Sequence, residues 1–271
     1  MGILPAAGRE FPEPEPSSAA RDGRPEATVN LAREMGYNFN TMKLLYEGKA
    51  KQVYEADEPG RVIIHFKDSL TAFDAVKKAT VEGKGALNCG ISAKLFQFLE
   101  DKGIRTHFLG QLSATSILAR RVRIVPLEVI VRFRAAGSFC KRYGVEKGKE
   151  LAIPIVEFSL KDDSLHDPLI CPMSVLALGL ASEEQVQEMQ KTALDAAYAL
   201  RGLFKEKGLE LVDMKFEFGV ADDGKLYLAD EISPDTMRLW TPDGESLDKD
   251  VFREDKGDVL ATYREVARRL E

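Results

Sequence analysis

Residues 212–219 (VDMKFEFG) are followed, after Asp223-Gly224, by residues 226–232 (LYLADEI), and the two segments have the pattern of paired strands. Because side chains alternate along a strand, the even positions 212–218 form an apolar face and the odd positions 213–217 form a charged one. Asp-Gly is typical of a two-residue hairpin turn. With that turn, Asp222 would pair with Lys225 and Glu217 would lie directly opposite Asp230. The sequence therefore predicts an antiparallel hairpin with two neighbouring carboxylates.

Two carboxylates facing each other on a hairpin are costly unless a cation lies between them. Opposed Cβ atoms are about 5 Å apart, and two ionised carboxylates at that distance repel by about 3 kcal/mol at an effective dielectric of about 20. Mg²⁺ commonly takes one or two carboxylates and completes its shell with water and phosphate oxygens. Glu217 and Asp230 are therefore candidate magnesium ligands, and Lys215 on the same face could contact a phosphate. The alternative is a solvent-exposed charged face whose side chains splay apart.

Outside this hairpin, strands and helices follow one another without strict alternation. Strands are predicted at 44–47, 52–56, 61–66, 105–109, 118–124 and 127–134, and helices at 89–102, from 138, at 182–207 and at 257–270. Gly103 and Gly208 are suited to end two of the helices, and Ser182 with Gln185 has the spacing of a capping box. Hairpins in place of regular βαβ units indicate the α+β class.

The first 41 residues differ from the rest of the chain. They contain five of the twelve prolines and little apolar surface to offset the entropy of ordering. We expect residues 1–41 to be a flexible N-terminal extension, with some helix around 29–35. Met42 opens the ordered part. We hypothesise that Met42 is the natural start of the protein, and the intact mass of protein from its native source would test this.

Composition excludes several classes of function. The net charge of −6 and the pI near 5.4 argue against a general binder of nucleic acid or anionic membranes, so phosphate binding must come from local basic clusters. No apolar run approaches the roughly 20 residues that span a bilayer, and the N-terminus lacks the features of a signal peptide. Three widely spaced cysteines and three scattered histidines argue against a structural zinc site or a disulfide framework. We expect a cytoplasmic protein, and a homo-oligomer is compatible with the sequence.

Gly48-Lys49-Ala50-Lys51 joins two predicted strands and is a candidate phosphate-binding turn. Glycine lets the backbone approach a ligand closely, and two lysines supply charge for a polyphosphate. The turn lacks the Walker pattern and is closer to the glycine-rich hairpin of kinases. An ordinary exposed hairpin is the alternative.

A second candidate anion site lies where the strand 127–134 ends. Arg132 and Arg134 point the same way and could clamp a carboxylate or phosphate, and Ser138 opens a helix whose free N–H groups favour anions. The alternative is a capped helix beside a surface salt-bridge network with Glu128. The loop after Asp230 adds Asp235 and Arg238 to the candidates.

These segments together resemble the phosphoribosylaminoimidazole-succinocarboxamide synthases, the SAICAR synthetases. The matching stretches are LLYEGKAKQVYEA, HFKDSLTAFDAVKK, EGKGALN, VPLEVIVRFRAAGS, HDPLI, LVDMKFEFG and ADEISPDTMRLW, and they cover nearly all of residues 43–271. Ala75, where many members carry glycine, is a departure. The resemblance implies an ATP-dependent ligase that joins the carboxylate of carboxyaminoimidazole ribotide (CAIR) to the amino group of L-aspartate, with Mg²⁺ as cofactor. Phosphorylating the carboxylate would create the leaving group that the amine displaces.

The resemblance also implies roles for individual residues. Lys215, Glu217 and Asp230 match catalytic positions, the two carboxylates also matching metal ligands. The positions that match ATP-binding residues are Lys49, Ala50, Lys51, Ala119, Arg120, Ile124, Lys161 and Lys215, with Asp167 near the phosphates. Those that match ribotide-binding residues are Arg132, Ser138, Asp235 and Arg238. For the aspartate pocket, Asp74 and residues 83–88 are candidates.

The family fold implies two α+β lobes with antiparallel-rich sheets, packed helices and ATP between the lobes, related in outline to ATP-grasp enzymes and kinases. We place a nucleotide-binding lobe at 42–122 and a substrate- and metal-binding lobe at 123–271. Two other functions are weighed against the ligase. A kinase-like small-molecule phosphotransferase would need no aspartate, and the HRD and DFG elements of kinases are absent. A non-catalytic nucleotide-binding module would predict loss of Lys49, Lys51, Glu217 or Asp230, all of which are present.

Overall fold

The computed structural model describes residues 42–72 and 77–271. The predictions for residues 1–41, including the helix around 29–35, lie outside the described residues, as do Asp74 and Ala75. Among the described helices, none is both long and apolar enough to cross a membrane.

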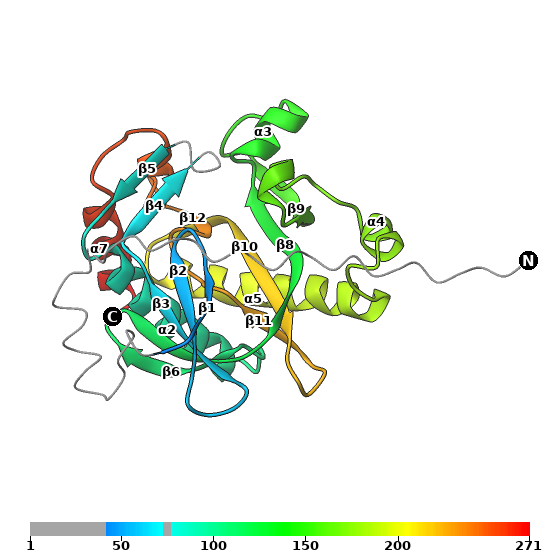
Figure 1. The fold of residues 1–271 in the computed structure, drawn as a ribbon. Coiled ribbons are helices and arrows are strands. Elements are labelled where there is room, and N and C mark those ends of the chain that lie inside the picture. Colours follow the sequence, from blue (N-terminus) through cyan, green and yellow to red (C-terminus); the bar gives the residue numbers. More distant parts are fainter. Residues whose placement is uncertain (1–41, 73–76) are drawn as a thin grey trace, which may run out of the picture.

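The first half of the chain forms a five-stranded antiparallel sheet with one helix against it (Figure 1). Its strand order is β1-β2-β3-β7-β6, with bounds Leu44–Glu47, Lys51–Glu55, Arg61–Phe66, Ser116–Arg120 and Phe108–Ser113. Helix α2 (Lys84–Asp101) covers it, and the hairpin of β4 (Ser69–Ala72) and β5 (Lys77–Thr80) stands beside it.

The second half of the chain builds another antiparallel sheet, in the order β11-β10-β8-β9. The bounds are Leu226–Ala229, Glu210–Val220, Arg123–Arg134 and Glu150–Leu160, and β12 (Met237–Trp240) pairs with the first part of β10. Helix α5 (Glu183–Glu206) packs across β10 and β8 (Figure 1). The shorter elements are α3 (Ser138–Tyr143), a 3₁₀ turn (Asp163–Leu165), α4 (Pro172–Ala177) and α6 (Asp250–Arg253).

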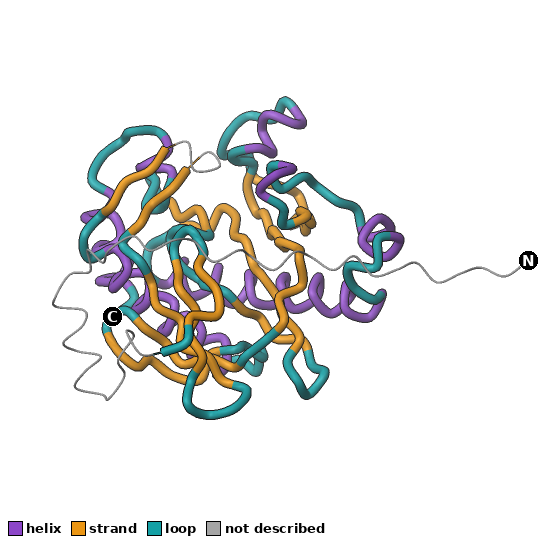
Figure 2. The backbone as a smooth tube through the Cα atoms, in the orientation of Figure 1, coloured by secondary structure: helices purple, strands orange, loops and turns teal. Residues whose placement is uncertain are grey.

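The two sheets share one hydrophobic core. A single buried cluster contains residues from β3, α2, β8, α5 and β10, and the last helix, α7 (Val259–Arg269), packs back against α2 in the first half (Figure 2). The chain passes from the first sheet to the second between Arg120, where β7 ends, and Arg123, where β8 begins. The division into lobes at 42–122 and 123–271 remains our proposal, and the shared core indicates that the lobes fold together.

Most local predictions are confirmed, and the errors are shifted boundaries and four missed strands. Helix α5 begins with the predicted capping box of Ser182 and Gln185. Helix α2 begins five residues before the predicted 89, and the predicted strand at 118–124 runs wrongly across the break between β7 and β8. The strands β4, β5, β9 and β12 were not predicted.

The central hairpin forms, but its predicted register is wrong by one residue. Glu217 pairs with Ala229, not with Asp230. The N–H of Gly224 donates to the carbonyl of Ala221, and Gly224 has a φ of 76°, which makes a three-residue loop with a left-handed third position. Asp223-Gly224 therefore belongs to a longer turn than the two-residue type on which the prediction rested.

Candidate active site

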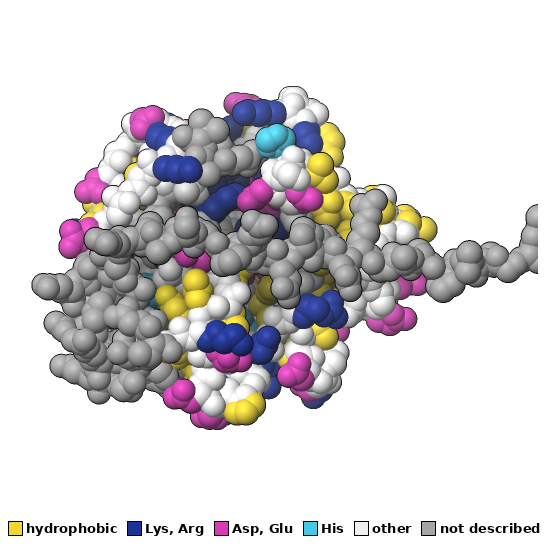
Figure 3. Space-filling view, in the orientation of Figure 1, with side chains coloured by type: hydrophobic (Ala, Val, Ile, Leu, Met, Phe, Trp, Pro, Cys, Tyr) yellow, Lys and Arg dark blue, Asp and Glu magenta, His cyan; other side chains and the backbone are white. Residues whose placement is uncertain are grey.

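A cavity of about 880 Å³ lies between the two sheets and is lined from both halves of the chain. The described residues of its wall include eight carboxylate residues and ten lysines and arginines. Figure 3 shows the same mixture on the drawn face, where basic and acidic side chains are interspersed without a large block of one sign. Local pairing, not net charge, therefore decides how an anion binds here.

The alternative of a solvent-exposed charged face on β10 is wrong. Asp213 and Glu217 on the charged face are only 4% and 3% exposed. The apolar residues on the opposite face of the strand are buried as well. Both faces of β10 are thus covered, one by the core and one by the charged wall of the cavity.

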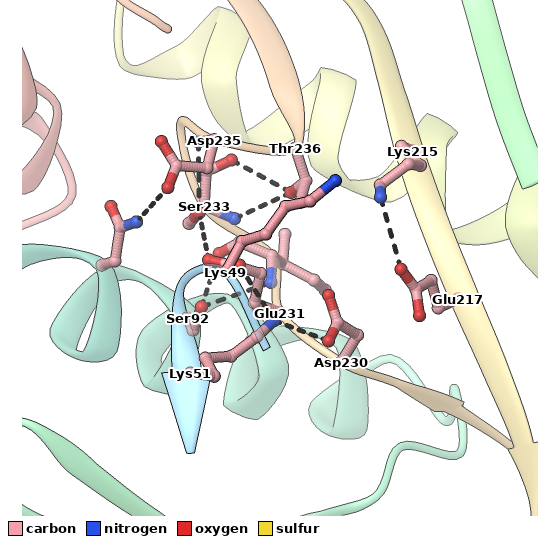
Figure 4. A network of polar contacts seen from close by, with 12 residues as sticks. Lys49, Lys51, Ser92, Lys215, Glu217, Asp230, Glu231, Ser233, Asp235 and Thr236 are labelled. Carbon is pink, nitrogen blue, oxygen red and sulfur yellow. Dashed lines mark hydrogen bonds and ion pairs between the residues drawn. The ribbon is translucent and has the colours of Figure 1, made fainter. Parts of the chain in front are cut away.

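Asp230 reaches the cavity because the backbone turns at the end of β11. Its φ is 67°, in the left-handed region that aspartate tolerates better than most residues. The Nζ of Lys51 lies 2.6 Å from Asp230 Oδ1 and 2.9 Å from Glu231 Oε1 (Figure 4). Burial lowers the pKa of Lys51, but the attraction of these two carboxylates outweighs it and holds that pKa above its usual value.

A histidine that sequence reasoning did not select, His107, lines the cavity near Asp230. The imidazole of His107 lies close to the Asp230 backbone, and its buried Nε2 has no hydrogen-bond partner among the described residues. Burial lowers the pKa of His107 to about 4, which keeps the ring neutral. A scattered histidine carries no sequence signal for such a position.

Glu217 is surrounded by ammonium groups from two elements. Lys161 binds its Oε2, and Lys215 Nζ lies 3.3 Å from its Oε1 and 2.5 Å from Glu128 Oε1. Burial lowers the pKa of Lys215, but attraction by Glu217 and Glu128 reverses this and raises that pKa. Figure 4 shows Lys215 and Glu217 on β10, facing the side from which Lys49 and Lys51 enter.

These carboxylates fit a magnesium ion held together with phosphate. Within residues 42–72 and 77–271, no group of three or more aspartate, glutamate, histidine or cysteine side chains is arranged to hold a metal alone. Mg²⁺ bound to a nucleotide needs only one or two protein carboxylates. Burial raises the pKa of Asp230, but Lys51, Lys161 and Lys215 outweigh it and hold that pKa below the usual range, so the group is ionised.

At the other end of the cavity, two arginines share one carboxylate. Arg132 Nη1 lies 2.5 Å and Arg238 Nη1 2.9 Å from Asp213 Oδ2. Arg132 also pairs with Glu157, and Arg238 with Asp250, at 2.7 Å each. Both guanidinium groups are thereby held in place on the cavity wall.

Two other predictions about this region fail in part. Arg134 does not join the clamp, because it binds Glu210 and donates to the carbonyl of Gly148. Glu128, proposed as the partner of the arginines, pairs with Lys215 instead. Ser138 begins α3 as predicted, but it is exposed, does not line the cavity and accepts a hydrogen bond from Arg142.

The predicted nucleotide-binding residues are mostly on the cavity wall. Those lining it are Lys49, Ala50, Lys51, Arg120, Ile124, Lys161, Asp167 and Lys215. Ala119 is the exception, because its side chain is fully buried in the core and absent from the cavity wall. Lys49 Nζ lies 2.6 Å from Asp163, so this lysine bridges the turn after β1 to the 3₁₀ turn.

Asp235 lines the cavity, but its oxygens are already bound by buried donors. Lys84 Nζ is 2.6 Å and Asn88 Nδ2 3.0 Å from Oδ2, and the hydroxyl of Tyr263 is 2.6 Å from Oδ1. Lys84 and Asn88 belong to the 83–88 segment suggested for the aspartate pocket, and here they tie α2 to the turn before β12. Asp235 is therefore held rigidly at the edge of the site.

The comparisons identify the family. The profile described as SAICAR synthetase matches residues 44–270, and the chain belongs to that family. It is 52% identical over 228 residues to the phosphoribosylaminoimidazole-succinocarboxamide synthase of Persephonella marina, covering 84% of this chain and 95% of the relative. The corresponding enzyme of Methanocaldococcus jannaschii is 49% identical, with 83% and 93% covered.

Solved structures agree with the fold. The synthase of Ehrlichia chaffeensis matches with a TM-score of 0.82 at 41% identity, covering 84% of this chain and 98% of that one. A SAICAR synthetase in complex with ADP matches with a TM-score of 0.81 at 44% identity, covering 83% and 96%. The α+β prediction and the family resemblance are thus confirmed.

Proposed function

We propose that this protein is an ATP-dependent ligase that joins CAIR to L-aspartate and forms SAICAR, ADP and phosphate in purine biosynthesis. The observation that carries the proposal is a single cavity, in a chain of the SAICAR synthetase family, lined by both a lysine–carboxylate cluster and a pair of arginines. The cluster suits a magnesium-bound polyphosphate, and the arginines suit the phosphate of a ribotide.

The chemistry needs positioning more than a protein nucleophile. A carboxylate oxygen of the ribotide takes the γ-phosphoryl group of ATP and releases ADP. The aspartate amine then attacks the acyl carbon, forms the C–N bond, loses a proton and expels phosphate. We propose that Lys49, Lys51, Lys161 and Lys215 position the phosphates and stabilise the negative charge that shifts during phosphoryl transfer.

Mg²⁺ would be held by Glu217 and Asp230 together with phosphate oxygens, and it would neutralise charge on the transferred group. In this structure, those carboxylates form ion pairs with Lys51, Lys161 and Lys215, and Lys51 Nζ lies 2.6 Å from Asp230 Oδ1. When nucleotide binds, we expect the ammonium groups to turn towards its phosphates.

The ribotide would lie with its phosphate on Arg132 and Arg238. Their shared partner Asp213 and the outer partner Asp250 act as positioning residues, because they fix the direction of each guanidinium group. Ser138 stays a proposed ribotide contact at the start of α3, and Asp235 a proposed contact at the edge of the site.

The test is ADP release from magnesium-ATP and CAIR, with and without L-aspartate, with the product identified by mass. Aspartate-dependent formation of the succinocarboxamide supports the ligase. ADP release that ignores aspartate would favour the phosphotransferase, and nucleotide binding without turnover would favour the non-catalytic module.

Cytoplasmic location and assembly into a homo-oligomer remain predictions. Size-exclusion chromatography with light scattering measures the second of these.

A further inference from the structure

Among residues 42–72 and 77–271, five lysines line the cavity, and four of them are neutralised by carboxylates. Lys49 pairs with Asp163, Lys51 with Asp230 and Glu231, Lys161 with Glu217, and Lys215 with Glu128 and Glu217. Lys249 is the fifth. Within the described part of the chain, its ammonium group forms no ion pair and donates no side-chain hydrogen bond.

The carboxylates that attract Lys249 are already committed to other donors. Asp235 is bound by Lys84, Asn88 and Tyr263. Glu231 has Oε1 at 2.9 Å from Lys51 Nζ and Oε2 at 2.6 Å from the Ser233 hydroxyl. Each acid therefore already has buried donors, and within the described residues neither forms an ion pair with Lys249.

The position of Lys249 is set by backbone contacts. Its N–H donates to the carbonyl of Pro234 at 3.2 Å, which holds the residue before α6 against the turn that carries Asp235. Burial lowers the pKa of Lys249, and the attraction of Asp235 does not restore it. A partly buried ammonium group without a partner is costly in the free protein, and a bound anion would remove that cost.

The other anions of the proposed reaction already have partners. The ATP phosphates are assigned to the four paired lysines, and the ribotide carboxylate that takes the γ-phosphoryl group must lie beside them. The ribotide phosphate is assigned to Arg132 and Arg238. What remains is the amino-acid substrate, which carries two carboxylates into a cavity already lined by eight acidic residues. An ammonium group that none of the described carboxylates neutralises is the feature that such a dicarboxylate requires.

We propose that Lys249 binds a carboxylate of the amino-acid substrate and so helps to place its amine against the ribotide. This assignment rests on the proposed function. Arg253 also lines the cavity, but its Nη1 lies 2.6 Å from Asp250, so it is the less available cation.

The test compares the wild type with Lys249→Gln, Lys249→Arg and the control Lys256→Gln, whose exposed side chain pairs with Glu254 outside the cavity. Loss of a charge-assisted hydrogen bond predicts a KM for L-aspartate that rises about tenfold to a hundredfold in Lys249→Gln. The KM values for ATP and CAIR should change by less than about threefold. Lys249→Arg should recover part of the loss, and the control should match the wild type.

Succinate, a dicarboxylate without the amine, gives a readout that does not require turnover. Its affinity for ADP-loaded protein, measured by calorimetry, should fall by a similar factor in Lys249→Gln, while ADP affinity stays constant. Asparagine and aspartate α-amide, each of which lacks one carboxylate, then show which carboxylate is bound. The wild type should discriminate against the analogue that lacks the bound carboxylate, and Lys249→Gln should lose that discrimination.

The outcomes separate this proposal from the function itself. A wild type without aspartate-dependent turnover would overturn the proposed function. An active wild type, with unchanged aspartate KM and succinate affinity in Lys249→Gln, would overturn the assignment of Lys249. A rise confined to the KM for CAIR would also overturn it and would place the ribotide on this lysine.

Discussion

Replacing Gly137 with alanine should damage ribotide binding through Arg238. Gly137 has φ 55° and ψ −130°, a region that residues with a side chain rarely enter. An added Cβ would lie 2.6 Å from Arg238 Nη2 and 2.9 Å from its Cζ. The guanidinium group cannot simply swing away, because Asp213 and Asp250 hold it on two sides.

The cost of this change has two parts. Backbone strain contributes about 1 to 3 kcal/mol. Displacing Arg238 from one charged partner contributes about 1.5 to 3 kcal/mol more. A total of about 4 kcal/mol corresponds to a Tm lowered by about 8 to 16 °C in a chain of this size.

The assay is steady-state kinetics with each substrate varied, together with thermal melting. The KM for CAIR should rise about tenfold to a hundredfold, while ADP affinity changes little, because the nucleotide lysines lie on other segments. Gly202→Ala in α5 is the matched control, since nothing lies within 4 Å of its added Cβ and its φ is not positive. A Gly137→Ala protein with unchanged Tm and unchanged KM for CAIR would refute the argument.

Three further outcomes are expected. Glu217→Gln and Asp230→Asn should each lower kcat by about a hundredfold or more, with only a modest fall in Tm; near-normal turnover at limiting magnesium would contradict their role as ligands. Burial and the nearby Asp250 raise the pKa of Asp248 to about 7, so the folded state binds more protons than the unfolded state between about pH 4 and 7. The stability of the wild type relative to Asp248→Asn, measured by urea unfolding, should therefore fall as pH rises through that window, by about 4 kcal/mol at most. Tyr263→Phe removes a donor to Asp235 and should cost about 1 to 3 kcal/mol in the same unfolding assay, and no loss would mean that the bond is dispensable.

Local patterns were sufficient for β10 and α5, although not for β12, which carries Arg238. Alternation along β10 predicted which residues share the charged face, and the capping box at Ser182 predicted where α5 begins. These features depend on neighbours within a few residues, so they can be read without knowledge of the fold.

The pairing of charges could not be read in this way. Lys51 contacts Asp230, and Arg132 contacts Asp213, across sequence separations of 179 and 81 residues. Such contacts depend on the packing of two sheets around a shared core. For this reason the sequence suggested Glu128 as a partner for the arginines, whereas the fold places it against Lys215.

By itself, the sequence determined the α+β class, the family and a set of site residues most of which line the cavity, because motifs and side-chain periodicity are local properties of the chain. Only the tertiary structure decided how the acids reach their places. The three-residue loop shifts the hairpin register, and the left-handed backbone at Asp230 compensates by turning its carboxylate towards Lys51. That Lys249 has no ion-pair partner among the described residues is likewise a property of the fold, because donors from distant segments already occupy the nearby carboxylates.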